Sequence, residues 1–343
     1  MAIDEATLHL LKDEEAPFLL FHGSANPDLA DAVARELRME LSPCAIERFP
    51  DGEIHVQVSE SVRGRDAYVI QSTCSALDGG GQRSLSVNEN LMELFIMLDT
   101  LHRANAARVT AIIPYYGYAR QDRKVVGREP ITAKLVADAL EVAGVDRVVA
   151  MDLHAGQIQG FFNVPVDHMT ALQLFAQYYR DKGLQGEGIV AVSPDPGRAK
   201  MARRFGQMLE GDLAILNKTR PAHDQAAVTE VIGDVKGKIA IMSDDMIVTG
   251  GTLIAGAEAL LGAGALEVYA CATHGLFPGD AFEKLAASKI TQVTVTNTVP
   301  VDPIKRPDKI DVLPVTTLLA ETIMNVFADD SVSAIFAGEN QLF

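Results

Sequence analysis

The sequence predicts an α/β protein whose mainly parallel sheets are flanked by helices, and two observations support this prediction. Short apolar runs with strand character alternate with longer segments that carry apolar residues at helical spacing. This alternation is typical of parallel sheets, whose strands are joined by helical crossovers. The pattern starts again near residues 162–167, so the chain of 343 residues is predicted to contain two α/β units of similar size.

The first unit is predicted to span residues 17–166 and to follow a loosely held extension at residues 1–16. Residues 48–53 are predicted to form a turn between two strand-like segments. The glycine- and serine-rich residues 75–86 are predicted to form a mobile surface loop, and residues 114–130 a long loop. Strands are expected at residues 18–21, 67–71, 108–113 and 147–151, and helices at residues 88–105 and 131–143, after a first helix that ends at Arg38.

The second unit is predicted to span residues 167–343, and its last helix is expected to pack on the first unit. Strands are expected at residues 189–193, 213–216, 228–232, 239–243, 268–273 and 292–296, and helices at residues 170–182, 197–209, 252–263, 280–287 and 316–327. In open α/β sheets, ligands bind at the carboxyl ends of the strands. We expect the motifs described below to lie at this edge.

The composition argues against several classes of protein. The formal net charge of −16 argues against nucleic acid as the main partner. No apolar run approaches the ~20 residues of a membrane span, and the acidic residues 1–15 lack the pattern of a signal peptide. Cys44, Cys74 and Cys271 lie far apart, without the spacing of a metal site or a disulfide scaffold. We therefore expect a cytoplasmic protein that binds neither nucleic acid nor a membrane.

One stretch of the second unit combines a strand, a glycine turn and a helix N-terminus. An apolar run ends at Asp244 and Asp245, and residues 248–252 read Val-Thr-Gly-Gly-Thr before an alanine-rich helix. Glycines let the backbone approach a ligand closely, and the first N–H groups of a helix bind phosphate. The two carboxylates suit hydroxyl groups or a phosphate-bound metal. An ordinary turn between a strand and a helix is the alternative.

The loop 114–130 concentrates positive charge in an acidic chain. Its three tyrosines are followed by four basic residues, and it contains only two acids. Arginine binds phosphate oxygens in a bidentate manner, and an aromatic ring can flank a base. Gly127 and the length of the loop would allow it to close over a ligand and exclude water. A solvated surface loop is the alternative.

Two further candidates follow predicted strands directly. His154, in Asp-Leu-His-Ala, could ligate a metal or contact a phosphate, although a lone histidine is more often structural. Asp195, in Ser-Pro-Asp-Pro-Gly, is a candidate ligand for Mg²⁺, which prefers few protein oxygens together with substrate phosphates. A helix cap is the alternative role for this aspartate.

Two pairs of charged residues complete the set. Lys218 and Arg220 lie close together after a predicted strand and would suit charge that builds up on a transferring phosphoryl group. A surface pair of cations is the ordinary explanation of such a pattern. Asp51 and Glu53 flank Gly52, and their carboxylates could accept hydrogen bonds from an adenine amine or a ribose hydroxyl. A plain β-turn is the alternative there.

Taken together and in this order, the motifs resemble those of the ribose-phosphate diphosphokinase (phosphoribosyl-pyrophosphate synthetase) family. Residues 244–252 resemble the ribose-phosphate loop of the phosphoribosyltransferase-like superfamily. The family resemblance implies two phosphoribosyltransferase-like domains, a homohexamer, and the conversion of ribose 5-phosphate and MgATP to phosphoribosyl pyrophosphate and AMP. It extends over residues 18–337 and rests on the segments 49–53, 116–123, 128–134, 152–155, 157–162, 193–195, 218–220, 232–235 and 273–274.

The resemblance also implies roles for individual residues. Lys218 would stabilise the transition state with Arg220 beside it, and Mg²⁺ would be bound at His154 and Asp195. The ATP site would be shared between subunits, because the hairpin turn would hold the adenine of an ATP bound mainly by a neighbouring subunit. The ATP-binding residues would be Phe49, Asp51, Gly52, Glu53, Arg120, Gln121, Asp122 and His154. The ribose 5-phosphate site would comprise Arg220, Asp244, Asp245, Val248, Thr249, Gly250, Gly251 and Thr252.

Three features depart from the family pattern. Val248 stands where an aspartate is expected, Pro196 and Arg198 stand where a small residue and a second glycine are usual, and the loop 75–88 is longer than expected. Arg198 is expected to add positive charge near the diphosphate. These departures leave a non-catalytic regulatory paralogue as one alternative. A phosphoribosyltransferase that consumes the product is another, although it would not need two full domains or the loop 114–130.

Overall fold

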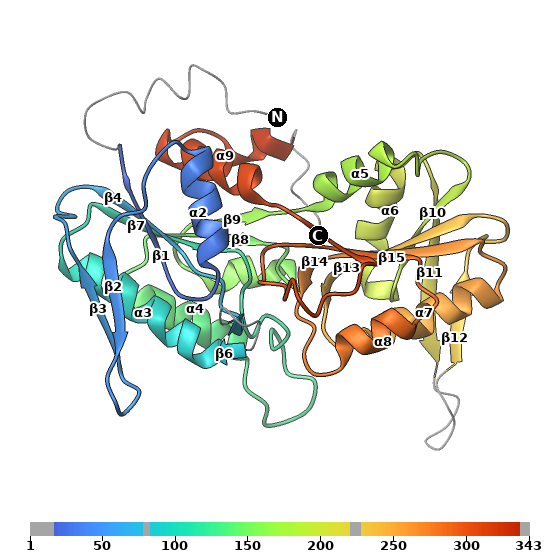
Figure 1. Cartoon of the computed structure of the whole chain (residues 1–343), viewed down its shortest axis with the longest axis horizontal. Coiled ribbons are helices and arrows are strands. Elements are labelled where there is room, and N and C mark those ends of the chain that lie inside the picture. The colour runs from blue at the N-terminus through green and yellow to red at the C-terminus, as the bar shows by residue number, and fades with distance from the viewer. Residues whose placement is uncertain (1–16, 78–82, 220–227, 337–343) are drawn as a thin grey trace. The chain divides into compact units, whose positions relative to one another are not determined.

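The computed structural model describes residues 17–77, 83–219 and 228–336, and the chain divides into two compact units (Figure 1). Of the described residues, the N-terminal unit contains those up to Met169, residues 298–300 and those from Pro314 onward. The C-terminal unit contains Thr170–Asn297 and Val301–Leu313. Each unit has its own mainly parallel sheet flanked by helices, which confirms the predicted fold class.

The sheet of the N-terminal unit contains five parallel strands in the order β1-β4-β7-β8-β9. Because helices cover both faces, the inner strands are buried and almost entirely apolar. The carboxyl ends of all five strands lie at one edge of the sheet. The strands are β1 (Leu19–His22), β4 (Asp66–Ile70), β7 (Arg108–Ile113), β8 (Arg147–Met151) and β9 (Val166–Met169).

Two pairs of helices cover this sheet (Figure 1). α3 (Val87–Arg103) and α4 (Thr132–Val142) pack on one face, where Phe21, Val69 and Ala111 point into the core. α2 (Pro27–Glu36) and α9 (Thr316–Phe327) pack together on the other face. There the ring of Phe18 contacts those of Tyr68 and Phe327. Helix α9 therefore belongs to the N-terminal unit, although it follows the last strand of the C-terminal unit in sequence.

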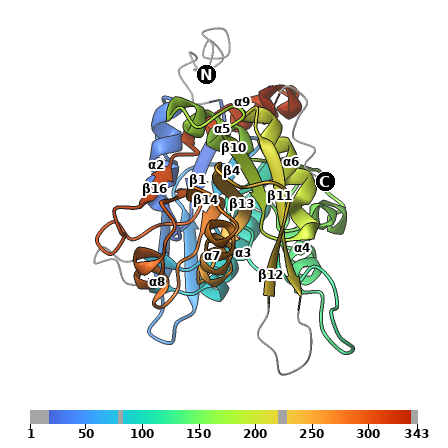
Figure 2. The ribbon, with the colours of Figure 1, turned by 90° about the vertical axis from the view of Figure 1, so that its right-hand side faces the viewer.

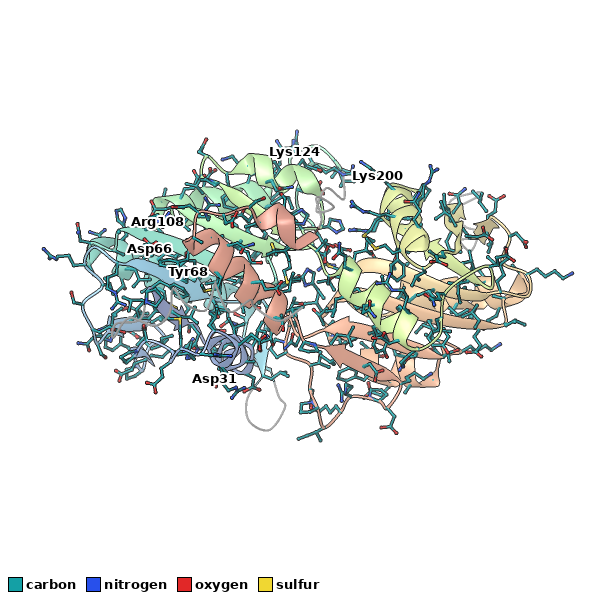
Figure 3. The ribbon with its side chains drawn as sticks, turned by 90° about the horizontal axis from the view of Figure 1, so that it is seen from above. Asp31, Asp66, Tyr68, Arg108, Lys124 and Lys200 are labelled. Carbon is teal, nitrogen blue, oxygen red and sulfur yellow. The ribbon has the colours of Figure 1, made fainter. Side chains whose placement is uncertain are left out.

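Two ion pairs of Arg108 connect the segment after α9 to the sheet. Arg108 at the start of β7 lies 2.5 Å from Asp66 of β4, beside Tyr68 (Figure 3). The same guanidinium lies 2.9 Å from Asp329. This double pairing holds the chain beyond α9 at the amino ends of β4 and β7.

Two hairpins lie outside the main sheet. β2 (Cys44–Arg48) and β3 (Ile54–Val58) form an antiparallel pair whose alternate side chains, such as Ile46 and Val56, pack on the core. β5 (Ala76–Leu77) and β6 (Arg83–Leu85) fall within residues 75–86, so the prediction of a simple loop there is wrong at these positions. Strands this short leave no recognisable alternation in the sequence. Residues 78–82 lie outside the described residues.

The sheet of the C-terminal unit contains seven strands in the order β12-β11-β10-β13-β14-β15-β16. All neighbours are parallel except β11 and β12, which form an antiparallel ribbon at one edge (Figure 2). The strands are β10 (Ile189–Ser193), β11 (Asp212–Thr219), β12 (Val228–Ile232), β13 (Ile239–Ile247), β14 (Glu267–Gly275), β15 (Gln292–Thr296) and β16 (Ile310–Leu313).

Helices also flank this second sheet. α7 (Gly251–Gly262) and α8 (Ala281–Ala287) pack on one face, and α5 (Leu172–Asp181) and α6 (Ala199–Met208) lie on the other (Figure 1). A Cβ atom at Gly256 would lie 2.7 Å from the Leu216 side chain, so glycine allows α7 to approach the sheet closely. Short 3₁₀ helices occur at η2 (Gly156–Phe161), η3 (Pro196–Arg198) and η4 (Val332–Phe336).

The structure differs from the sequence-based expectations mainly at strand ends and sheet edges. Strands β9 and β16 were not predicted, because short edge strands with polar residues lack a continuous apolar run. Strand β13 continues beyond residue 243 to Ile247, so both aspartates belong to the strand rather than to the loop after it. None of the helices in the described part of the chain has the length and apolar character that a membrane span requires.

Candidate active site

The turn after β13 places the start of α7 at the carboxyl edge of the C-terminal sheet. Strand β13 ends at Ile247, and residues 248–250 connect it to Gly251, the first residue of α7. The N-cap residue is Gly250, and no described side chain forms a capping hydrogen bond there. Thr249, Gly251 and Thr252 are exposed, whereas Val248 is half-buried. The first N–H groups of α7, with the positive end of the helix dipole, are therefore available to an anion.

Gly250 gives this turn its shape. Its φ of +76° lies in the left-handed region, which side chains with a Cβ atom rarely adopt. A Cβ atom at this position would lie 2.9 Å from Cδ2 of Leu285 in α8. Both the backbone conformation and the close packing of α8 therefore require glycine.

Arg198 bridges the two aspartates of β13. Its Nε lies 3.0 Å from Asp244 Oδ1, and its Nη2 lies 2.8 Å from Asp245 Oδ1. Burial raises the pKa of Asp244 well above its usual value, the charge of Asp245 raises it further, and Arg198 opposes the shift. The charge of Arg198 is thus directed at the aspartates, which revises the expectation that it adds positive charge near a diphosphate.

The remaining candidates of the C-terminal unit follow β10 and β11. Asp195 is exposed, and its Oδ1 accepts a hydrogen bond of 3.2 Å from the backbone N–H of Arg198. It therefore caps η3, which was the alternative role for this aspartate, and the cap uses one of its carboxylate oxygens. Lys218 lies in β11 opposite Thr229 of β12. The side chain of Lys218 and the whole of Arg220 lie outside the described residues.

The first part of the loop 114–130 is packed into the N-terminal unit. Tyr116 is 2% exposed, and its hydroxyl donates to the Ala133 carbonyl at 3.0 Å, while burial raises its pKa. Gly117 donates its N–H to Thr73 Oγ1 at 2.6 Å, and a Cβ atom there would collide with the Thr73 carbonyl. Tyr115 is buried as well. Tyr115 and Tyr116 are therefore core residues, so an aromatic ring of this loop that flanks a base would have to be that of the half-buried Tyr118.

The tip of this loop projects into solvent. Residues 123–128 are exposed, including Val125 at 79% and Val126 at 61%. The backbone N–H groups of these valines donate to Glu129 Oε2 at 2.8 and 3.0 Å, which holds the tip as a compact turn. Lys124 lies at the surface of this turn (Figure 3). The start of the loop is therefore fixed by packing, whereas its tip is solvated and positively charged.

A partly buried hydrogen bond joins Asp122 of the loop 114–130 to the segment after β8. Asp122 is 9% exposed, and its Oδ2 accepts a hydrogen bond of 2.6 Å from Gln157 Nε2 in η2. Strands β7 and β8 are neighbours, so the segments that follow them meet at the same edge of the sheet. The exposed side chains of Arg120 and Gln121 and the half-buried His154 are therefore placed at one edge of this unit.

The turn 49–53 forms the tip of the β2-β3 hairpin. The Phe49 N–H donates to the Glu53 carbonyl at 2.9 Å, and Gly52 occupies the left-handed region at a φ of +94°. Asp51, Gly52 and Glu53 are exposed, and the ring of Phe49, 51% exposed, lies beside that of His55. The polar groups of the tip are accessible to a ligand.

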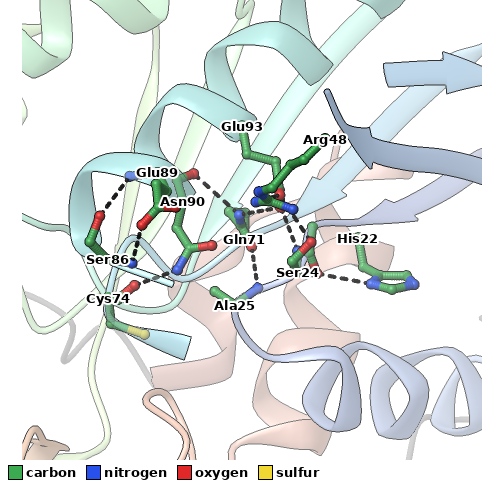
Figure 4. Close-up of polar contacts among 11 residues, drawn as sticks. His22, Ser24, Ala25, Arg48, Gln71, Cys74, Ser86, Glu89, Asn90 and Glu93 are labelled. Carbon is green, nitrogen blue, oxygen red and sulfur yellow. Dashed lines mark hydrogen bonds and ion pairs between the residues drawn. The ribbon is translucent and has the colours of Figure 1, made fainter. Parts of the chain in front are cut away.

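A buried carboxylate that sequence reasoning missed anchors this hairpin (Figure 4). Glu93 of α3 is 0% exposed and accepts hydrogen bonds from Arg48 Nη2 at 2.9 Å and Gln71 Nε2 at 2.9 Å. It also accepts from the backbone N–H and Oγ of Ser24 at 2.5 and 2.9 Å. Gln71 and Ser24 follow β4 and β1, and Arg48 is the last residue of β2 before the turn 49–53, so Glu93 connects two strand ends to the turn end of the hairpin. The signal in the sequence was a pair of polar residues, Asn90 and Glu93, on the apolar stripe of α3.

Within the C-terminal unit, Asp195, Asp244, Asp245 and the turn 248–252 lie at the carboxyl edge of the sheet. Within the N-terminal unit, residues 120–122 and His154 follow the neighbouring strands β7 and β8. Within the described ranges, no three His, Cys, Asp or Glu side chains cluster as a metal site would require. Mg²⁺ bound mostly by substrate phosphates and water needs only one or two carboxylates, and the exposed Asp195 fits that requirement.

Comparison with known proteins covers both units. Residues 18–144 match the N-terminal domain of ribose phosphate pyrophosphokinase, and residues 218–337 match the phosphoribosyl synthetase-associated domain. The ribose-phosphate pyrophosphokinase of Caldanaerobacter subterraneus subsp. tengcongensis is 51% identical over 317 residues, which are 92% of this chain and 97% of the relative. That of Gloeobacter violaceus is 48% identical over 330 residues, which are 96% and 95% of the two chains.

A solved structure gives the same result. The crystal structure of phosphoribosylpyrophosphate synthetase from Mycobacterium smegmatis superimposes with a TM-score of 0.81 at 45% sequence identity. The match covers 91% of this chain and 99% of that one, so it includes both phosphoribosyltransferase-like domains. Sequence and fold therefore agree over nearly the full length, and the chain belongs to the ribose-phosphate pyrophosphokinase family.

Proposed function

We propose that the protein transfers the diphosphoryl group of MgATP to the anomeric hydroxyl of ribose 5-phosphate, which yields 5-phosphoribosyl 1-pyrophosphate and AMP for nucleotide biosynthesis. The observation that carries this proposal is the turn 248–252, where the uncapped N-terminus of α7 lies beyond two carboxylates. The relatives named ribose-phosphate pyrophosphokinase support the same reaction.

Ribose 5-phosphate binds at this turn in the proposed mechanism. Its phosphate accepts hydrogen bonds from the backbone N–H groups of residues 249–252, each contributing about 1.5–3 kcal/mol for a charged partner. Its ribose hydroxyls donate to Asp244 and Asp245. Val248 supplies no carboxylate, but the phosphate contacts are made by the backbone and do not depend on that side chain.

ATP binds at the N-terminal unit. Arg120 and Gln121 contact the nucleotide, Asp122 fixes the base of their loop through Gln157, and His154 lies beside the polyphosphate. The exposed tip of the β2-β3 hairpin, with Phe49, Asp51, Gly52 and Glu53, binds the adenine of an ATP held mainly by a neighbouring subunit. The homohexamer is proposed from the family resemblance, and such sharing requires that subunits contact each other at this hairpin.

The transferred group is a diphosphoryl, so catalysis depends on positioning and on charge stabilisation. The anomeric hydroxyl attacks the β-phosphorus of ATP in line, the bond from that phosphorus to the oxygen it shares with the α-phosphorus breaks, and AMP leaves with that oxygen. Lys218 and Arg220 stabilise the negative charge that builds up on the transferring group. His154 and Asp195 would each contribute to a Mg²⁺ site, and Mg²⁺ would supply further charge neutralisation on the phosphates.

Water must be excluded, because it would otherwise accept the diphosphoryl group. The basic tip of the loop 114–130 is long enough to close over the bound polyphosphate. Closure would bury the exposed side chains of Val125 and Val126. The hydrophobic free energy of this burial would favour a closed site from which water is excluded. The proposed setting is the cytoplasm, where the three free cysteines remain reduced.

The product of the reaction tests the proposal directly. Pure protein incubated with MgATP and ribose 5-phosphate should form AMP in step with phosphoribosyl pyrophosphate, and chromatography of the nucleotides separates AMP from ADP. Formation of ADP would show a simple phosphoryl transfer and contradict the proposal. No AMP from the pure protein, together with an altered rate of an added active synthetase, would instead identify a regulatory paralogue.

A further inference from the structure

Arg198 occupies the space between two carboxylates that the proposed mechanism assigns to the sugar. Its guanidinium is nearly buried, with 12% of the side chain exposed, and the side chains of Asp244 and Asp245 are 19% and 4% exposed. Strand β10 pairs with β13 in a parallel register that aligns Val192 with Met242. The segment after β10 therefore runs beside the aspartates, and η3 brings residue 198 to them.

The contact has the geometry of a bridging cation. One nitrogen of the guanidinium contacts Asp244, and a different nitrogen contacts Asp245, so a single side chain spans both carboxylates. Planar guanidinium groups suit such paired contacts, and they remain charged at any ordinary pH. Two adjacent, nearly buried carboxylates repel each other unless a cation lies between them. That cation comes here from the chain itself.

We propose that Arg198 is a built-in counter-ion that takes the place of a divalent cation between Asp244 and Asp245. The proposal deepens the function proposed above and rests on it for the identity of the sugar ligand. Since the carboxylates are already neutralised, ribose 5-phosphate binds to the nucleotide-free protein without a divalent ion. The metal then enters the active site only with ATP, bound mainly by its phosphates.

Removal of the guanidinium should expose a cation site that the natural chain hides. The test measures Mn²⁺ binding to the metal-free, full-length protein by electron paramagnetic resonance, without substrates. Arg198→Ala and Arg198→Gln are expected to bind one Mn²⁺ about ten-fold or more tightly than the natural chain. The glutamine variant preserves most of the side-chain volume. If the alanine variant does not fold, Mn²⁺ binding is therefore still measured with the glutamine variant.

Arg203→Ala is the matched control, because Arg203 is an exposed arginine on α6, outside the proposed site. It should leave Mn²⁺ binding unchanged. Adding Asp245→Asn to the Arg198→Gln variant should abolish the gained site, because one of the two carboxylates is then neutral.

The result that would overturn the proposal is Mn²⁺ binding by both Arg198 variants no tighter than by the Arg203 variant. Calorimetric titration with ribose 5-phosphate gives a second readout. The natural chain should bind the sugar equally with and without a chelator, whereas the Arg198 variants should lose affinity when the chelator removes the metal. Equal loss in the natural chain would also refute the counter-ion role. Because Mn²⁺ binding is measured without turnover, a failure of this proposal is distinguishable from a failure of AMP formation by the natural chain.

Discussion

Replacement of Glu93 by alanine should weaken the binding of ATP although Glu93 touches no proposed ligand. The change removes the acceptor for Arg48, Gln71 and Ser24. Breaking a buried ion pair from one side costs about 3–5 kcal/mol. The Arg48 side chain is 28% exposed and regains some hydration, so we expect a loss of about 3 kcal/mol in the free energy of unfolding.

A loss of this size leaves the protein folded, because domains of this kind have about 5–15 kcal/mol of stability. The change should also have a local effect, since Glu93 connects Arg48, at the turn end of the β2-β3 hairpin, to the ends of β1 and β4. The turn 49–53 would then no longer be held in one place. We expect the KM for ATP to rise about ten-fold, which corresponds to about 1.4 kcal/mol, and the KM for ribose 5-phosphate to stay unchanged.

Urea denaturation measures the change in stability, and steady-state kinetics with each substrate varied in turn measures the change in KM. Glu89→Ala is the control, because Glu89 is an exposed glutamate of the same helix that closes the capping box with Ser86. Its loss should cost about 0.5–2 kcal/mol of stability without affecting ATP. If the Glu93 variant had the same KM for ATP as the Glu89 variant, the anchoring role of Glu93 would be refuted.

Three further predictions concern the proposed substrate sites. Gly250→Ala introduces about 1–2 kcal/mol of backbone strain and a clash with Leu285, so calorimetry should show ribose 5-phosphate binding at least about ten-fold weaker; unchanged affinity would count against the turn as its anchor. Asp122→Ala removes the acceptor for Gln157 and should raise the KM for ATP about ten-fold, whereas an equal rise for both substrates would indicate general unfolding. Val248→Asp restores the usual residue of the family and should lower the KM for ribose 5-phosphate or raise turnover by about ten-fold; no change in either would show that this position is irrelevant.

The sequence predicted the buried elements well because each has a continuous local signal. Strands β7 and β8 have the predicted bounds, since they are apolar runs bounded by polar residues. The glycine turn before α7 was also found, because its shape depends on residue types that are adjacent in the chain. Edge strands β9 and β16 escaped prediction, since one neighbour and partial exposure leave only a weak pattern.

The polar contacts could not be predicted, because they join residues far apart in the sequence. Arg198 is more than forty residues from the aspartates that it bridges, and nothing local to it indicates a partner. Glu93 lies sixty-nine residues from Ser24. Its position on the apolar face of α3 indicates a buried charge but does not identify the residues that it contacts. Burial of Tyr115 and Tyr116 followed from tertiary packing rather than from the composition of their loop.

The most direct test of the proposed sugar site is a crystal structure of the protein grown with ribose 5-phosphate. We expect the phosphate within hydrogen-bond distance of the backbone N–H groups of residues 249–252, with the ribose hydroxyls at Asp244 and Asp245. A turn without phosphate, or a sugar bound elsewhere with the Val248 side chain filling the turn, would contradict it.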